Sequence, residues 1–173
     1  MANGDFYLTR LINSITQQSF RDYEVIITKQ GKTSENTNKA IKQAKGELIK
    51  IMHMDDYFAH EHALQAIVDA FNGTWLVTAC QTDTGRVHYP VYNENQNTIG
   101  SPSVLTFKNG LDIYFDETLE WLLDLELYRR LYAKYGEPVI IDDINVTIGI
   151  HADQQTNKLS AEIKNAEESN LIK

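Results

Sequence analysis

Three polar side chains follow a strand-like apolar run and could do chemistry together. The run ELIKIMH, residues 47 to 53, ends in Met54 and a pair of aspartates, so that His53, Asp55 and Asp56 fall at its carboxyl end. Ligands of open α/β sheets bind beyond the carboxyl ends of parallel strands. An imidazole and a carboxylate there can hold manganese or magnesium, with phosphate oxygens completing the shell. The alternative is that Asp56 only caps the next helix and His53 points elsewhere.

The first half of the chain alternates between helix and strand patterns, which must position these residues. Apolar spacing predicts a helix over residues 8–15, a helix over 34–44 and a helix over 64–71. Short apolar runs predict strands at 23–28, 47–53 and 75–82. Strands that alternate with helices indicate crossover connections, so we expect an α/β sheet with mainly parallel strands, flanked by helices.

The second half is less regular. It predicts a short strand at 86–92, a polar loop at 93–103, two short strands around an Asn109-Gly110 turn, and a long helix over 118–135. A last extended segment covers 139–151, and helical spacing recurs from Thr156 to Ile172. We therefore expect one domain over residues 1–155 and a helical tail over 156–173. Polar, glycine-containing loops such as 93–103 carry function or are disordered.

Composition restricts the classes of partner. The chain has 173 residues and a formal net charge of −8, which argues against nucleic acid or an anionic membrane as the main partner. No apolar run approaches the ~20 residues that a membrane span requires, so we expect a protein that is not transmembrane, with a cytoplasmic location. The single cysteine, Cys80, lies in an apolar strand pattern and is expected to be a buried structural thiol.

Several segments, in this order, carry a family resemblance. They are YLTRLINSITQQSFRDYEVIIT at 7–28, NKAIKQAKGELI at 38–49, MDD at 54–56, FDETLEWLLDLELYRRL at 115–131 and IHADQQT at 150–156. Together they resemble the family 2 glycosyltransferases with the GT-A fold, a Rossmann-like α/β fold, over roughly residues 4 to 155. The resemblance implies a hexosyltransferase-like enzyme whose donor is a nucleotide-diphosphate sugar.

The resemblance also implies roles for individual residues. Asp55 matches the acid that binds the metal ion bridging to the diphosphate, and Asp56 matches the following acid, which contacts the sugar or orients the metal. His53 stands at the first acid of the D-x-D motif and remains a possible ligand. His151 matches a histidine that approaches the metal or the phosphates; a structural histidine at a strand end is the alternative. Asp124, three residues after Trp121, matches the general base; a helix carboxylate paired with a nearby cation is the alternative.

The start of the chain departs from the family pattern. The sequence begins at about the turn that follows the family's opening strand, so we expect no counterpart of that strand. TKQGK at 28–32 stands where members carry aspartates that help to read the base. Lys29 could instead meet a phosphate, and Asn38 lies where the nucleotide-side helix begins, although a place on the helix surface is the alternative for Asn38. The family's edge strand between 23–28 and the next helix also has no counterpart, so either 23–28 pairs directly with 47–53 or a sheet edge stays open. Open edges favour self-association, so we expect a homodimer.

Two functions from different classes follow from these observations. The first is a metal-dependent, inverting glycosyltransferase that uses Mn²⁺ or Mg²⁺ and moves a sugar to an acceptor hydroxyl, on a glycan or another molecule. The second is a non-catalytic GT-A-like scaffold that binds a nucleotide sugar, a glycan or a partner protein. The retained acids favour the first, and the altered N-terminal segment favours the second. A nucleotidyl-transferring enzyme would need a basic, glycine-rich phosphate loop near the N-terminus, which this sequence lacks.

Overall fold

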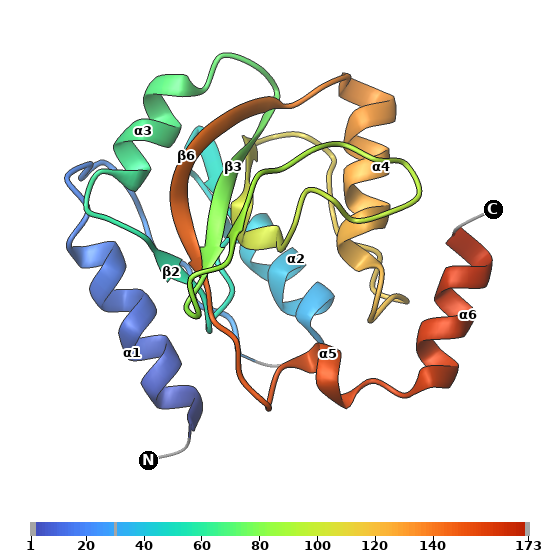
Figure 1. The fold of residues 1–173 in the computed structure, drawn as a ribbon. Helices are drawn as coiled ribbons and strands as arrows, with labels where there is room; N and C mark the ends of the chain where they lie inside the picture. The colour runs from blue at the N-terminus through green and yellow to red at the C-terminus, as the bar shows by residue number, and fades with distance from the viewer. Residues whose placement is uncertain (1–2, 30, 172–173) are drawn as a thin grey trace.

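A six-stranded sheet with helices on both faces forms the protein (Figure 1). The computed structural model describes residues 3–29 and 31–171, so Ile172, the expected end of the tail helix, lies outside the described residues. The strands are β1 Leu48–Lys50, β2 Tyr57–Phe58, β3 Trp75–Thr82, β4 Val87–His88, β5 Leu105–Lys108 and β6 Val139–Ile148. The helices are α1 Asn3–Thr16, α2 Thr33–Gln43, α3 Ala63–Ala70, α4 Leu123–Tyr135, α5 Gln155–Lys158 and α6 Ala161–Leu171, with a 3₁₀ turn at Pro102–Val104.

The sheet is mixed in direction. Its order is β1-β5-β3-β6-β2, and β4 pairs with β3 beside this path. Strands β3 and β6 pair in parallel, and the other pairs among the described residues are antiparallel. Strands β1, β3 and β6 still run in one direction, because β5 lies between β1 and β3 and is antiparallel to both. The predicted mixed α/β sheet is therefore confirmed, although most neighbouring strands are antiparallel where crossovers predicted parallel pairs.

Side-chain alternation along β3 builds a core on each face of the sheet. Trp75 and Val77 face one layer, where they pack in a cluster with α2 and α4 residues such as Ile41 and Leu127. Leu76 faces the other layer and packs with α3 residues such as Ile67. Figure 1 accordingly shows α1 and α3 on one side of the sheet and α4 on the other. The two layers fix the strand ends that carry the polar residues.

The apolar run 23–28 is not a strand, which corrects the prediction. Its backbone forms no ladder with the sheet, and Val25 and Ile27 are 46% and 50% exposed. Strand β1 pairs with β5, and no second strand pairs with β1 among the described residues. A strand needs a paired neighbour to satisfy its backbone groups. Without that neighbour, an apolar β-type run remains an extended surface segment.

The hairpin predicted around Asn109 and Gly110 is also wrong. Strand β5 precedes the turn, but residues 112–116 form no strand. The Asn109 side-chain amide instead donates to the carbonyl oxygens of Ala44 and Gly46, at 3.0 and 2.8 Å, which ties the turn to the connection between α2 and β1. The turn residue therefore serves a contact between distant segments of the chain.

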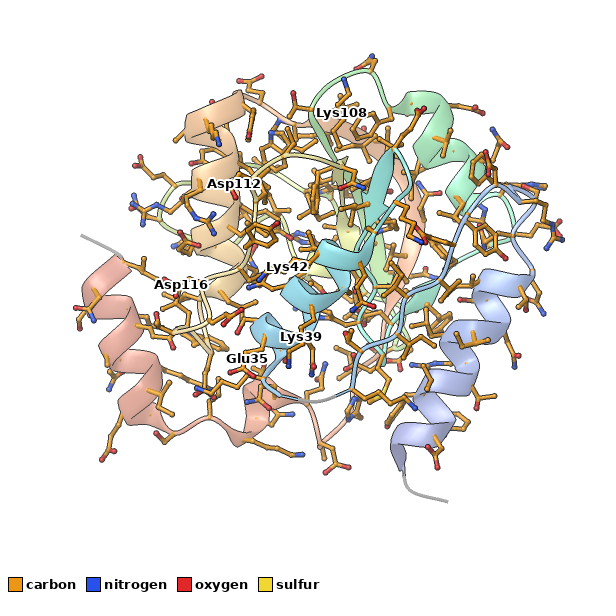
Figure 2. All side chains as sticks on the ribbon, turned by 180° about the vertical axis from the view of Figure 1, so that it is seen from behind. Glu35, Lys39, Lys42, Lys108, Asp112 and Asp116 are labelled. Carbon is orange, nitrogen blue, oxygen red and sulfur yellow. The ribbon has the colours of Figure 1, made fainter. Side chains whose placement is uncertain are left out.

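Helix α2 lies against the sheet with a charged outer face. Figure 2 shows Lys39 and Lys42 on this helix, with Asp112 and Asp116 on the adjacent loop. Ser34, Asn38 and Ile41 form the buried side of the helix. This pattern is that of an amphipathic helix packed on one face.

The tail forms two helices, α5 and α6, where one was predicted. Ser160 separates them, and its hydroxyl oxygen accepts from the Ile163 N–H at 3.3 Å. Helix α6 lies beside the end at which α4 begins (Figure 1). Among the described residues, no helix is long and apolar enough to cross a membrane.

Candidate functional site

Asp55 and His151 meet at the end of the sheet, as the sequence motifs predict for a shared site. The His151 Nε2 atom lies 3.1 Å from Asp55 Oδ2, and the two side chains are 17% and 24% exposed. Asp55 comes from the loop between β1 and β2, and His151 follows β6. The ring of Tyr7 in α1 stacks on the imidazole with centroids 4.4 Å apart. A carboxylate and an imidazole are thus held at hydrogen-bonding distance and remain open to solvent.

Asp56 lies beside Asp55 but points into the protein. It is 2% exposed, and its carboxylate accepts from the Gly149 N–H at 3.1 Å and the Ser101 hydroxyl at 3.2 Å. Burial, and next the negative charge of Asp55, raise the pKa of Asp56 to about 7. Asp56 therefore joins the loop between β1 and β2 (residues 51–56, called the acid loop below) to the end of β6 and to the 97–104 segment. Its predicted contact with a donor sugar stays a prediction.

His53 and Lys50 are half-buried and lie near the two acids, since the charge of Asp55 acts on His53 and that of Asp56 acts on Lys50. The His53 backbone N–H donates to Ser103 Oγ at 2.8 Å, and its Nε2 atom is buried without a hydrogen-bond partner. Burial lowers the pKa of His53 and lowers that of Lys50 to about 7. The Lys50 ammonium donates to the Ser103 carbonyl oxygen. His53 is thus a neutral imidazole near neutral pH, which is the form that binds metal ions.

Arg10, in α1, binds the acid loop. Its Nη2 atom donates to the Asp55 carbonyl oxygen at 2.5 Å, and its guanidinium lies 4.2 Å from the Tyr57 ring centroid. Its Nη1 atom lies 3.8 Å from Asp83 Oδ2, at the end of β3. Asp83 in turn accepts from the Ile150 N–H at 3.2 Å. One arginine therefore links α1, the acid loop and the ends of two strands.

Gly149 lies where no side chain fits. A methyl group added there would be 2.7 Å from Arg10 Nη2 and closer still to the Asp55 carbonyl oxygen. We predict that Gly149→Ala displaces the acid loop and lowers stability by about 1–3 kcal/mol, the usual cost of overpacking. Chemical denaturation measures this loss. Gly46→Ala is the matched control, because its methyl would lie 3.6 Å from the nearest atom; equal losses in the two variants would contradict the prediction.

Asp124 lies in α4, as predicted, but in its first turn, because the helix begins at Leu123 and not near Thr118; the 97–101 loop connects it to the acid pair, Asp55 and Asp56. Its carboxylate accepts from Asn97 Nδ2 at 2.7 Å and from the Leu125 N–H at 2.8 Å. The Asn97 amide also binds Gly100, and the next residue, Ser101, donates to Asp56. Burial raises the pKa of Asp124 to about 6. A carboxyl group with a pKa just below neutral pH is mainly ionised there and is suited to act as a general base.

The two remaining predicted nucleotide-binding residues are Asn38, which is buried, and Lys29, which is exposed. The Asn38 side chain is 3% exposed and donates from Nδ2 to the Phe115 carbonyl oxygen and to Glu117 Oε1, both at 2.9 Å. Its Oδ1 atom accepts from the Phe115 N–H at 2.8 Å. Asn38 thus ties α2 to the segment that leads toward α4. Lys29 is exposed at the end of the extended segment 20–29, and Gln30 lies outside the described residues.

Sequence reasoning missed several residues of this site. The apolar spacing that predicts the first helix gives no indication that Arg10 binds the acid loop. Gly149 carried a usable signal, since a glycine at a strand end marks a close backbone approach. Ser101 and Asn97 fall in the 93–103 loop that was predicted to be functional or disordered, but nothing in that loop indicated which atoms they would bind.

The side chains that could bind a metal ion partly match the requirements of a divalent ion. Among the described residues, no three His, Cys, Asp or Glu side chains gather in metal-binding geometry. Asp55 and His151 do meet, and His53 and His151 each have a buried ring nitrogen with no hydrogen-bond partner. Mg²⁺ and similar ions are commonly held by one or two carboxylates together with substrate phosphates. The site therefore fits an ion that shares its shell with a bound diphosphate.

Comparisons with known proteins agree on the fold. No protein-family model and no curated protein matches the sequence. The solved structure of S. aureus TarS 1-349 with UDP-GlcNAc is similar, with a TM-score of 0.70 and 19% identity over 92% of this chain and 59% of that one. The complex of the same protein with UDP gives a TM-score of 0.66 and 20% identity over 87% and 58% of the two chains.

A longer TarS structure gives a TM-score of 0.67 and 20% identity over 87% of this chain and 36% of that chain. This chain thus spans less than two thirds of the TarS chains that it matches. Likeness at this identity shows a shared fold. The GT-A-like fold predicted from the sequence is therefore confirmed, and membership of family 2 stays a prediction.

Proposed function

We propose that this protein is a metal-dependent glycosyltransferase that uses a nucleotide-diphosphate sugar. The observation that carries the proposal is the pairing of Asp55 with His151 at the end of the sheet. The shared fold supports it, because TarS of this fold has been solved with UDP and with UDP-GlcNAc. We therefore propose a uridine diphosphate sugar as the donor to test first.

In this proposal Asp55 and His151 would hold the metal ion, and the neutral His53 imidazole lies near Asp55. The ion, when bound, neutralises the charge of the departing diphosphate. Asp56 keeps Asp55 in place through its bonds to Gly149 and Ser101. Lys29, exposed at the end of segment 20–29, is proposed to meet a phosphate of the donor, and we assign Asn38 a structural role because its amide binds within the fold.

Asp124 is proposed as the general base of an inverting transfer. Its carboxylate takes the proton of the acceptor hydroxyl while the hydroxyl oxygen bonds to the anomeric carbon and the bond to the diphosphate breaks. Asn97 and the Leu125 N–H hold one oxygen of the carboxylate each. The 97–101 segment then links the base to the acid pair through Ser101.

Turnover of the donor tests the proposal. We expect the protein to release UDP from UDP-GlcNAc or a related donor when manganese is present, and to stop when a chelator removes the metal. Release of UDP is measured with the full chain, with and without candidate acceptors. Equal release with manganese and with chelator would contradict metal dependence. If UDP or another nucleotide diphosphate were released from no sugar nucleotide, the proposal that the protein is a glycosyltransferase would be contradicted.

The pH dependence of kcat follows from the raised pKa of Asp124. A base must be deprotonated, so we predict that kcat falls as pH drops through about 6 and levels off above neutral pH. Burial also raises the pKa of Asp56, so either acid could cause the fall of kcat at low pH (the acidic limb of the pH profile). The variant Asn97→Ala distinguishes between them. Asn97 lowers the pKa of Asp124, and its loss should move the limb to higher pH. A limb near pH 4 in the unmodified protein, or one that Asn97→Ala leaves in place, would contradict the assignment.

A non-catalytic scaffold is the second candidate, and one observation favours it. The segment 20–29, which precedes the expected base-reading position, stands outside the sheet and leaves Val25 and Ile27 exposed. A scaffold would bind a nucleotide sugar, a glycan or a protein without consuming the donor. Such a protein would show binding of UDP-GlcNAc without release of UDP. The predicted homodimer is tested separately by the mass of the protein in solution.

A further inference from the structure

Helix α6 carries one buried side chain, and that side chain is a carboxylate. Glu167 is 9% exposed, whereas the apolar Ile163 is 36% exposed. Burying a carboxylate is costly unless hydrogen bonds compensate for the lost hydration. A mostly polar helix that buries only a carboxylate is held in place by what that carboxylate binds.

The Glu167 carboxylate binds three successive backbone N–H groups. Its Oε1 atom accepts from the Glu120 N–H at 2.8 Å. Its Oε2 atom accepts from the N–H groups of Trp121 and Leu122 at 2.9 and 2.8 Å. Successive N–H groups that converge in this way form an anion-binding concavity. The carboxylate therefore fixes the backbone of residues 120–122.

Neighbouring contacts hold α6 in the same place. The Trp121 indole donates to Glu168 Oε1 at 3.2 Å, and the Lys164 ammonium lies 4.6 Å from the indole ring centroid. Arg129 of α4 donates to the Leu171 carbonyl oxygen at 2.5 Å. Helix α6 thus contacts the segment before α4 and the middle of α4 itself, mainly through polar groups.

The fixed segment leads directly into the residue proposed as the base. Leu122 is the cap residue of α4 and makes no side-chain capping bond, and Asp124 follows two residues later. The predicted helix began at residue 118, yet residues 118–122 are not helical in the structure. Their N–H groups at 120, 121 and 122 are taken by Glu167 instead.

We propose that Glu167 is a positioning residue for Asp124. By binding the N–H groups of residues 120–122, it sets where α4 begins and so where the Asp124 carboxylate lies. The inference rests on the proposed role of Asp124 as general base. It assigns α6 an indirect part in the active site, through the backbone of residues 120–122.

Three variants of the full chain test this inference. Glu167→Ala removes the carboxylate, and Glu167→Gln keeps the size and one acceptor oxygen in case the first variant folds poorly. Glu162→Ala is the matched control, because Glu162 is an exposed acid of the same helix. Amide hydrogen exchange reports whether the N–H groups of residues 120–122 are still bound. The carboxyl ¹³C titration of Asp124 reports whether the surroundings of that carboxyl group have changed. Neither measurement needs turnover. Kinetics with donor and acceptor report the consequence for catalysis.

We expect exchange at 120–122 to rise about tenfold or more in Glu167→Ala, since three bonds to a charged acceptor are lost. The pKa of Asp124 should move toward its ordinary value as the first turn of α4 becomes more exposed. The kcat should fall ~10–100-fold while KM for the donor changes little, and Glu167→Gln should lie between. Glu162→Ala should match the unmodified protein.

The outcomes separate the two proposals. Unchanged exchange and an unchanged Asp124 titration would overturn the positioning role, whatever the kinetics. A changed titration with an unchanged kcat would also overturn it. If the unmodified protein shows no turnover, the proposed function fails, while a shift of the Asp124 titration in Glu167→Ala would still support Glu167 as the residue that positions Asp124.

Discussion

Asp124→Asn is expected to lower kcat by ~10²–10⁴-fold, the usual contribution of a general base. Asparagine has nearly the same shape as aspartate and can still accept from the Leu125 N–H, so the helix should keep its start. It cannot take a proton from an acceptor hydroxyl. The affinity for UDP should remain near that of the unmodified protein, because the diphosphate is proposed to bind at Asp55. Steady-state kinetics and a UDP titration measure the two quantities.

Glu126→Gln is the matched control for this variant. Glu126 lies two residues further along α4, and its carboxylate accepts two bonds from Arg130, at 2.5 and 2.7 Å. Loss of one of these bonds should cost ~1 kcal/mol of stability and leave kcat nearly unchanged. If Asp124→Asn retained full kcat, Asp124 would be a helix carboxylate without a part in the reaction.

Asp55→Ala is expected to remove the metal-dependent part of UDP binding. Loss of a residue that merely supports a metal ligand typically costs 10–100-fold in affinity, and loss of the ligand itself should cost at least ~100-fold. Removing the carboxylate also leaves the His151 imidazole without its partner. Turnover should fall with binding. Calorimetry with manganese, and again with a chelator, measures the effect.

Asp69→Ala is the control for Asp55, because Asp69 is an exposed acid on α3 whose carboxylate accepts from Gln65. It should leave both UDP binding and turnover as they are. Thermal denaturation should also confirm that the Asp55 variant stays folded. Manganese-dependent UDP binding that survives in Asp55→Ala would place the metal elsewhere and overturn the assignment of this site.

Local patterns predicted the elements whose burial is continuous or regularly spaced. Strand β3 matches its predicted range because six successive buried residues follow from an uninterrupted apolar run. Helix α2 lies within one residue of its predicted bounds, since its inward positions recur at helical spacing. In these segments the residues that decide the structure lie within the segment itself.

The predictions from local sequence were wrong where the local structure depends on a group far away in the chain. The run 23–28 has the residue types of a strand, but a strand also needs a neighbour, and local sequence does not state whether one is present. The first turn predicted for α4 is occupied instead by a segment bound to Glu167, 45 to 47 positions away. No spacing rule connects these residues.

The same distinction separates the predicted and the missed parts of the site. Asp55 and His151 were predicted to share a site because their motifs resemble a known family, and the structure places them 3.1 Å apart. Asp56 was predicted beside Asp55, but its inward direction depends on Gly149, 93 positions further along the chain. Arg10 binds a backbone oxygen, which leaves no pattern in the sequence at either end.

Calorimetric titration of UDP into the full chain, with manganese and with a chelator, examines the proposed site most closely. If Asp55 and His151 hold a metal ion that binds the diphosphate, UDP should bind with manganese and lose most of its affinity with chelator. The folded state should also gain thermal stability only when both are present, because a ligand that binds the folded state stabilises it. UDP binding that is equally strong with chelator, or absent under both conditions, would contradict the metal-dependent site proposed here.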